Sequence, residues 1–429
     1  MVIPLFEANA IEHFLNQLQT RNAQVSIEIQ QSVREILENV RERGDEALIQ
    51  YTKEFDKTDV ATLGLRVKEE EMETAISTQN PKIMEIFQHA VVNIRRFHEK
   101  TKRTSWIEWQ ENGVVLGQQV SPIEKVGIYV PGGRAVYPSS LFMAVIPAQV
   151  AGVSRIVITS PPGPDGKVHP LILLASHALG IHEIYRIGGA QAIGALAFGT
   201  QTIPKVDKIV GPGNRYVAEA KRQVFGIVDI DMIAGPSEVV ILADESASPH
   251  FVAGDLLAQA EHDPFASAIC ITPSSTLAKQ IQEAIEVQFQ KLKRKEILKQ
   301  SLSSWGAIIL VDCLENGIAL VNWLAPEHLG LHTKNPWEIL GAIRNAGAIF
   351  LGHYAPETVG DYWAGPNHIL PTNTTARFFS PLSTEDFQKT SSIIYYTKSA
   401  LEQHGSEIIQ FAQLEELDAH ANAIQVRIQ

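Results

Sequence analysis

The apolar residues of the chain follow two different periods, and the period changes near residue 126. Between residues 25 and 56 they repeat at helical spacing without a proline, and a second apolar helical face runs from Pro81 to Ile94. Proline suits the first turn of a helix, so Pro81 marks the start of the second one. Around Asn112-Gly113 the apolar positions alternate, which is typical of a β-hairpin. The first hundred residues are therefore expected to be mainly helical.

Beyond residue 126, short apolar runs alternate with helical segments in two series. The runs are the expected strands, at 126–130, 155–160, 183–187 and 208–210 in the first series and at 238–243, 267–272, 307–311, 329–332 and 348–351 in the second. One long helix is expected after the strand at 267–272, ending near Lys299. Strand–helix alternation favours mostly parallel sheets. The sequence predicts an α/β fold with two Rossmann-like domains, a helical N-terminal region and a small C-terminal tail domain.

Composition narrows the class of protein. The 429 residues exceed what one core holds, and the net charge of −12 comes from 48 acidic and 36 basic residues. The one dense basic run, 291–295, falls in an expected helix and is interpreted as a solvated face, so no nucleic-acid partner is expected. Two cysteines, Cys270 and Cys313, suit a reducing compartment. No membrane-length apolar stretch or signal-peptide pattern is seen, and we expect a cytoplasmic protein without a membrane partner.

Five short polar islands carry the candidate chemistry. They are Gln259-Ala260-Glu261-His262-Asp263, Pro326-Glu327-His328, Gly360-Asp361, Asn367-His368 and Glu415…His420. Imidazole nitrogen and carboxylate oxygen are ligands that zinc accepts. Adjacent Glu and His are also the usual residues for proton transfer. Each island alone is explained as well by a helix cap or a surface histidine, so the prediction of a metal and acid–base site depends on their joint occurrence.

Spacing constrains how two of these islands work. Gln259 and His262 are three residues apart, which places both on one face of a helix. Glu415 and His420 are five apart, which is roughly 140° around an ideal helix. Those two side chains converge only if the helix breaks between them, and Asp418 is the expected N-cap of a second short helix.

Three glycine turns lie in the first strand–helix series, each after an expected strand and before a helix. They are 131–133, 188–191 and 211–214. Backbone N–H groups at such a helix start bind phosphate. The third turn resembles a dinucleotide fingerprint, but Tyr216 stands where the last glycine belongs. A purely structural role, as tight turns that need glycine, stays open from these residues alone.

Taken in order, these motifs resemble those of the histidinol dehydrogenase family. The resemblance covers nearly the whole chain. Its residues are Val126-Gly127-Ile128-Tyr129-Val130-Pro131-Gly132-Gly133, Gly188-Gly189-Ala190-Gln191-Ala192-Ile193, Gly211-Pro212-Gly213-Asn214, Ala234-Gly235-Pro236-Ser237-Glu238, Gln259-Ala260-Glu261-His262, Pro326-Glu327-His328-Leu329, Gly360-Asp361-Tyr362 and Asn367-His368-x-Leu370-Pro371-Thr372. The family oxidises L-histidinol through L-histidinal to L-histidine, the last step of histidine biosynthesis, using two NAD and a water.

The resemblance implies a role for each matching position. It implies one zinc per subunit bound by Gln259, His262, Asp361 and His420, and NAD, the co-substrate, bound by Tyr129, Gln191 and Asn214. It implies Glu327 and His328 as the catalytic pair. Beside the zinc ligands and His328, the substrate contacts it implies are Ser237, His368 and Glu415. It also implies a homodimer in which the C-terminal tail of one subunit completes the site of the other.

Domain boundaries follow from the strand series and the resemblance together. We expect an N-terminal helical arm at 1–25, a metal- and substrate-binding domain at 26–128 with 238–382, an NAD-binding domain at 129–237 and a tail at 383–429. Two other classes of function stay open: a zinc hydrolase in which Glu327 activates water, and a non-catalytic metal-binding dimer. A thiol mechanism is not expected, because Cys270 lies in an apolar strand and Cys313 has no neighbouring base.

Overall fold

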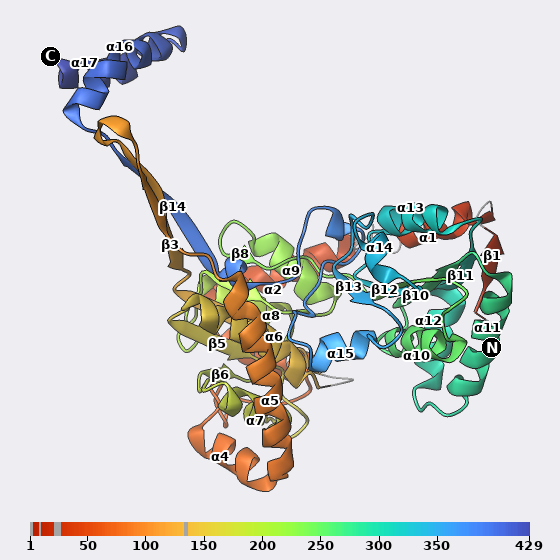
Figure 1. The fold of residues 1–429 in the computed structure, drawn as a ribbon. Coiled ribbons are helices and arrows are strands. Elements are labelled where there is room, and N and C mark those ends of the chain that lie inside the picture. The colour runs from red at the N-terminus through yellow and green to blue at the C-terminus, as the bar shows by residue number, and fades with distance from the viewer. Residues whose placement is uncertain (1–2, 8–9, 21–26, 133–135) are drawn as a thin grey trace.

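The chain forms two α/β lobes and a projecting arm. The computed structural model describes residues 3–7, 10–20, 27–132 and 136–429. Figure 1 shows the lobes side by side, with the arm leading away from the first lobe to the C-terminus. Gly133, which belongs to the first expected glycine turn, lies outside the described residues. Among the helices of the described ranges, none is long and apolar enough to cross a membrane.

The first lobe contains a five-stranded parallel sheet in the order β6-β5-β4-β7-β8. Its strands are β4 (Lys125–Tyr129), β5 (Arg155–Thr159), β6 (Ile184–Tyr185), β7 (Lys208–Val210) and β8 (Asp229–Ile230). In chain order this is 3-2-1-4-5, the order of a doubly wound nucleotide-binding sheet. The parallel sheet predicted from the apolar runs is therefore confirmed.

Helices cover both faces of this sheet. They are α2 (Ile27–Arg43), α3 (Asp45–Phe55), α4 (Glu69–Thr78), α5 (Pro81–His98), α6 (Pro138–Ala151), α7 (Pro170–Ala178), α8 (Gly189–Phe198) and α9 (Arg215–Val224). One core joins α4–α7 to one face of the sheet, and a second joins α2, α3, α8 and α9 to the other.

This packing corrects the expected grouping of residues 26–128 with 238–382. Helix α2 lies against α8, where a Cβ on Gly194 would come within 3.1 Å of Leu37 and 3.3 Å of Val40. Helix α8 is buried along nearly its whole length, so it needs an outer layer, and α2 supplies one. Helices α2–α5 therefore belong to the first lobe, as does β4.

The second lobe contains a six-stranded parallel sheet in the order β1-β11-β10-β9-β12-β13. Its strands are β1 (Leu5–Glu7), β9 (Glu238–Ala243), β10 (Ser267–Thr272), β11 (Gly306–Leu310), β12 (His328–His332) and β13 (Ala348–Leu351). Without β1 the chain order is again 3-2-1-4-5. The expected helical arm at 1–25 is wrong in part, because β1 pairs with β11 at the sheet edge, just after the buried Ile3 and before helix α1 (Glu12–Thr20) begins.

The helices of this lobe also lie in two layers. They are α10 (Pro249–Ala260), α11 (Ser275–Phe289), α12 (Lys295–Trp305), α13 (Leu314–Leu324), α14 (Pro336–Leu340) and α15 (Glu357–Tyr362). Helices α10–α12 share a core on one face, and α1 and α13 share a core on the other. The single helix expected through Lys299 is two, because it ends at Phe289 and restarts at Lys295. Lys291 and Lys295 would be like charges one turn apart, which disfavours a continuous helix.

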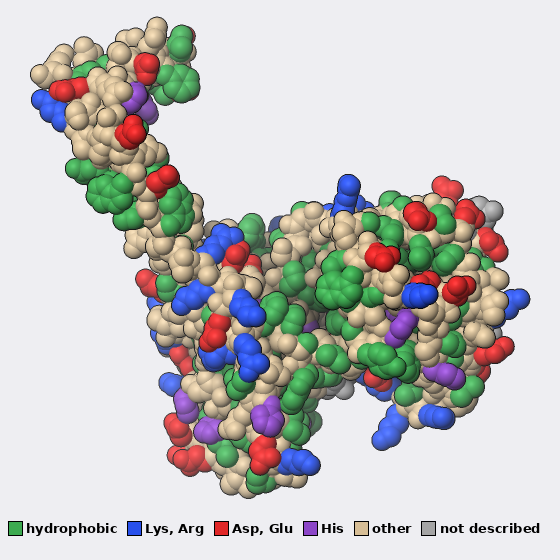
Figure 2. Space-filling model, in the orientation of Figure 1, with side chains coloured by type: hydrophobic (Ala, Val, Ile, Leu, Met, Phe, Trp, Pro, Cys, Tyr) green, Lys and Arg blue, Asp and Glu red, His purple; other side chains and the backbone are tan. Residues whose placement is uncertain are grey.

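The arm is an antiparallel sheet, β14-β3-β2, tipped by two helices. Its elements are β2 (Trp106–Trp109), β3 (Val115–Pro122), β14 (Gln388–Tyr395), α16 (Lys398–Leu414) and α17 (Asp418–Ile428). The predicted hairpin turn is confirmed, with φ of 72° at Asn112 and 78° at Gly113. The arm carries apolar side chains away from the body (Figure 2), including Trp109 at 72% and Ile394 at 71% exposed.

Candidate active site

Most of the polar islands meet at one edge of the second lobe. Gln259 is fully buried in the last turn of α10, and His262 lies two residues beyond the end of that helix, not on its face as expected. Glu327 and His328 stand at the start of β12, and Asp361 lies in α15. Helices α10 and α15 run back from the carboxyl ends of β9 and β13, so their last residues return to the edge where β12 begins. Segments distant in sequence are thereby brought together.

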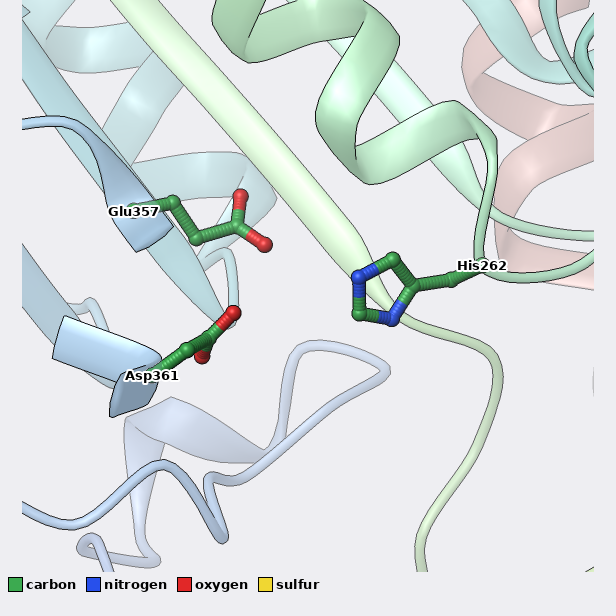
Figure 3. Close-up of side chains that lie close together, drawn as sticks. All are labelled: His262, Glu357 and Asp361. Atoms are coloured by element: carbon green, nitrogen blue, oxygen red, sulfur yellow. The ribbon is translucent and has the colours of Figure 1, made fainter. Parts of the chain in front are cut away.

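Three side chains form a metal-type cluster. His262, Glu357 and Asp361 each offer a ligand atom, and these atoms all lie within 4.8 Å of one another. Figure 3 shows the imidazole and the two carboxylates turned toward one another. The pKa of Glu357 is held well above its usual range. Burial is the largest cause, and the nearby carboxylates of Asp361, Glu327 and Asp255 add to it. Burial likewise raises the pKa of Asp361 to about 6 and lowers the pKa of His262. A cation would relieve this unfavourable concentration of carboxylates, and N and O donors suit zinc.

Glu357 is the residue that the sequence reasoning missed. It lies one turn before Asp361 on the same face of α15, and its side chain is buried. With its amide nitrogen turned toward the carboxylate, Gln259 donates to both oxygens of Glu357 at 3.1 Å. The spacing of four residues between Glu357 and Asp361 was a usable signal, since it places two carboxylates on one helical face.

His328 has the geometry of a general base. Its Nδ1 donates to the backbone carbonyl of Glu238 at 3.1 Å, which leaves Nε2 as the unprotonated nitrogen. Nε2 is buried and has no hydrogen-bond partner among the described residues. Burial, with smaller contributions from His262 and His368, lowers the pKa of His328 to about 3, although the hydrogen bond to Glu238 opposes the shift. The imidazole is therefore neutral at physiological pH, and its Nε2 lone pair is available as an acceptor, while burial makes it a weaker base than free imidazole.

Glu327 and His328 both contact the backbone of Glu238. Oε2 of Glu327 accepts a hydrogen bond from the Glu238 amide at 2.8 Å and lies 3.7 Å from Nδ1 of His328. Ser237 immediately precedes β9 and Glu238, so it lies at the same edge of the sheet. The backbone of Glu238 thus holds both members of the catalytic pair implied by the resemblance.

His368 connects this site to the first lobe. Its Nδ1 donates to the carbonyl of Asp361 at 3.1 Å, and its Nε2 accepts from the Ser140 hydroxyl of α6 at 3.3 Å. Burial lowers the pKa of His368 to about 4. The neighbouring Asn367 donates to the carbonyl of Met143 at 2.7 Å. The metal-type cluster therefore lies where the two lobes touch.

The three residues implied for NAD follow strands of the first sheet at its carboxyl edge. Tyr129 ends β4, Gln191 lies in the first turn of α8, and Asn214 caps α9 by accepting from the amides of Tyr216 and Val217. Burial raises the pKa of Tyr129 to about 12, and its hydroxyl accepts from the Gly189 amide at 3.2 Å. This edge, near the point where strand order reverses between β4 and β7, is where such sheets bind ligands.

Gln191 provides a test of whether a polar cofactor fits there. Its side chain is 1% exposed, and neither its Oε1 nor its Nε2 has a hydrogen-bond partner within the described ranges. A buried amide left unpaired costs about 1–3 kcal/mol, so the position favours a polar ligand that pairs with it. The residues present fit NAD.

The tail residues lie elsewhere. Glu415 and His420 line a groove of about 560 Å³ between α16 and α17, at the tip of the arm (Figure 1). The predicted helix break is confirmed, since α16 ends at Leu414, Glu416 has φ of 58° and α17 begins at Asp418. The N-cap is Leu417, so the expectation for Asp418 is wrong by one residue. An acidic residue in the first turn still suits the helix dipole.

Neither cysteine has the environment of a catalytic nucleophile. Cys270 is fully buried in β10, and burial raises the pKa of its thiol to about 12. Cys313 is partly buried and precedes α13, on the opposite edge of the sheet from His328. The residues on which a thiol mechanism would depend are thus apart from the cluster.

Comparison with known proteins identifies the family. The family model described as histidinol dehydrogenase matches residues 19–428. Histidinol dehydrogenase of Geobacillus kaustophilus is 54% identical over 94% of both chains, and that of Caldanaerobacter subterraneus is 53% identical over 96% of this chain and 95% of its own. The crystal structure of histidinol dehydrogenase from Elizabethkingia anophelis superposes with a TM-score of 0.94 at 40% identity, covering 99% of this chain and 98% of that one. The chain belongs to the histidinol dehydrogenase family.

Proposed function

We propose that this chain oxidises L-histidinol to L-histidine in two steps, with NAD accepting hydride in each. The observation that supports this most directly is Nε2 of His328, which belongs to a neutral imidazole, has no hydrogen-bond partner in the described part of the chain and lies beside the cluster of His262, Glu357 and Asp361. A base, a metal-type donor set and a dinucleotide edge in the adjoining lobe are the parts that such a reaction needs. Membership in a family of oxidoreductases argues against the zinc-hydrolase alternative.

In this proposal Gln259, His262 and Asp361 hold zinc, together with His420 from a second copy of the chain. Bound zinc would orient the substrate by taking its imidazole and amine nitrogens. Ser237, His368 and the second copy's Glu415 would contact the substrate around it. Glu357 accepts hydrogen bonds from Gln259 and so would fix the amide beside the metal.

The proton steps fall to His328 and Glu327. His328 Nε2 accepts the hydroxyl proton of histidinol while hydride leaves the carbinol carbon for NAD, which yields histidinal. Glu327 then accepts a proton from a water whose oxygen adds to the aldehyde carbon. His328 takes a hydroxyl proton from this hydrate as a second hydride leaves for a second NAD. The products are the carboxylate of histidine, two NADH and three protons.

The two half-reactions separate the roles of the pair. Glu327→Gln should slow oxidation of added histidinal more than the oxidation of histidinol to histidinal, because only the second oxidation needs water. NADH absorbance in single-turnover reactions with each substrate measures both rates. Equal slowing of the two rates would contradict the role of Glu327. No NADH from wild-type enzyme with histidinol would contradict the proposed function itself.

A homodimer that shares its sites is the second part of the proposal. The groove with Glu415 and His420 lies at the arm tip, and apolar side chains there are exposed, including Phe411 at 66% and Leu414 at 78%. Subunit exchange between inactive His328→Ala and impaired His420→Ala tests it. If the tail acts on the other subunit, one site in each hybrid is intact and activity returns to roughly 25% of wild type, assuming independent sites in a two-fold dimer. If His420 serves its own subunit, mixing restores nothing. A cytoplasmic location stays a prediction.

A further inference from the structure

A buried ion pair binds the backbone of Gly211, in the third glycine turn of the first lobe. Lys221 of α9 and Asp231, which follows β8, pair with side chains that are 3% and 1% exposed. Both also bind the same residue: Nζ of Lys221 donates to the Gly211 carbonyl at 3.1 Å, and Oδ2 of Asp231 accepts from the Gly211 amide at 2.8 Å. The polar groups on both sides of Gly211 are therefore fixed by one charged pair.

Gly211 cannot move without consequences for its neighbours. It follows β7 directly and has φ of 125°, a conformation that side-chain-bearing residues rarely adopt. A Cβ at Gly211 would lie 2.1 Å from the carbonyl oxygen of Tyr129, so the turn presses on the end of β4. Three residues later Asn214 caps α9. A shift of Gly211 would therefore displace Tyr129 and Asn214 together.

Stability alone is a weak reason for such a pair. Removing two charges from water is costly, and replacing a buried ion pair by apolar residues of similar volume is often neutral or stabilising. The pair is separated from His328 and the metal-type cluster, which lie in the other lobe. Its contacts converge instead on the dinucleotide edge of the first sheet, between β4 and β7.

We propose that Lys221 and Asp231 are positioning residues for NAD, which hold Gly211 so that Tyr129 and Asn214 meet the dinucleotide. The inference rests on the proposed NAD site. Neither residue is placed to touch the cofactor, since both lie beneath the turn and are buried. Their effect is on the geometry of the turn, and it should appear in NAD affinity and not in the handling of histidinol or zinc.

Two variants separate positioning from folding. Lys221→Met leaves Asp231 buried without its cation, which also destabilises the lobe. The double variant Lys221→Met/Asp231→Leu removes both charges, so the fold should recover while the hold on Gly211 stays lost. In the double variant we expect the Kd for NAD and the KM for NAD to rise about tenfold, the equivalent of one lost hydrogen bond. The KM for histidinol and the zinc content should be unchanged.

The same two strands supply a matched control. Lys208 of β7 and Asp229 of β8 pair at 2.8 Å near the amino ends of the strands, with side chains 6% and 47% exposed. Lys208→Met removes an ion pair from the same sheet without touching a glycine turn. It should leave NAD affinity at the wild-type value.

The measurements are calorimetric titration with NAD, circular dichroism and steady-state kinetics on the full-length holoenzyme. A folded double variant with wild-type NAD affinity would overturn the positioning role and leave the NAD site standing. An equal loss in Lys208→Met would also overturn it, because any buried charge would then suffice. If wild-type protein fails to bind NAD, or Gln191→Ala binds it as well as wild type, the proposed NAD site fails and the inference fails with it.

Discussion

The two lobes have the same strand order but present their candidate residues at opposite edges. In the first lobe Tyr129, Gln191 and Asn214 follow the carboxyl ends of strands. In the second lobe His328 begins β12, and Gln259 ends a helix that has returned to the amino edge. The rule that ligands bind at the carboxyl edge of an open α/β sheet therefore locates the NAD residues and mislocates the metal-type cluster.

The difference follows from how the lobes touch. The amino edge of the second sheet faces the first lobe, where His368 bonds Ser140 and Asn367 bonds Met143. A residue at the start of β12 is thus carried to the boundary between lobes, while a residue at the end of β12 is carried away from it. His332, at that far end, pairs with Asp255 at 3.1 Å. Strand order alone does not say which edge is used, because the partner surface decides it.

The largest expected effect tests whether the lobes divide the work. His328→Asn should lower kcat for both oxidations by about 10²–10⁴-fold, because it removes the general base of each step. NAD affinity should not change, since the residues implied for NAD lie in the other lobe. Single-turnover kinetics and NAD titration measure the two effects. A parallel loss of NAD affinity would show that the division between lobes is wrong.

The next effect concerns Glu357, the unanticipated member of the cluster. Glu357→Gln should weaken zinc binding by about 10–100-fold, because an amide cannot supply the charge that a dication stabilises. The metal-free variant should be at least as stable as the wild type, because a folded pKa above the unfolded one costs stability at neutral pH and an amide has no such cost. Chelator competition gives the affinity, and thermal unfolding gives the stability. Exposed Glu338→Gln is the control, and unchanged zinc affinity in Glu357→Gln would remove Glu357 from the site.

Most of the strands were predictable because they are short apolar runs between turn residues, whereas the two-residue strand β8 was not expected. β7, β9 and β10 have the residues expected from the sequence alone. The destination of α2 was not predictable in this way. Its amphipathic pattern shows that one face is buried, but the pattern does not say which core receives it. The three-residue strand β1 is too short to have a period, and its place is set by pairing with β11.

The site residues divide in the same way, into those that the sequence predicts and those whose place only the packing reveals. Gln259, His262, Asp361 and His368 were named through motif order and a family resemblance, and the structure brings them to one edge. Glu357 has no motif of its own, and only the packing of α15 reveals its burial. His420 is the converse case, because the sequence names it while the fold of one subunit carries it to the tip of the arm.

A smaller effect concerns the seam between the lobes. His98 ends α5, is fully buried and lies 3.5 Å from Asn367, and burial lowers its pKa to about 4. The folded pKa is below the unfolded value near 6.5, so the unfolded chain binds the proton first as pH falls. Stability should be constant above pH 6.5 from this group and fall by about 3 kcal/mol on the way to pH 4. Urea unfolding of metal-free protein measures it. His98→Leu should lack this part of the pH dependence, and an identical slope in the variant would refute the assignment.

The smallest expected effect tests whether the two cysteines of the second lobe take part in the reaction. Cys270 lies within β10 with its thiol pKa raised to about 12, and Cys313 follows the carboxyl end of β11, so neither thiol is at the amino edge. A nucleophile that formed a thiohemiacetal with histidinal would need a thiolate within reach of the aldehyde. Cys270→Ser and Cys313→Ser should therefore keep most of the activity in both oxidations. Rates with histidinol and with added histidinal should stay in their wild-type ratio, after correction for folded protein. Selective loss of the second oxidation in either variant would assign that step to a thiol and not to Glu327. The second lobe would then not carry out all of its chemistry at the amino edge, and the contrast with the first lobe would be wrong.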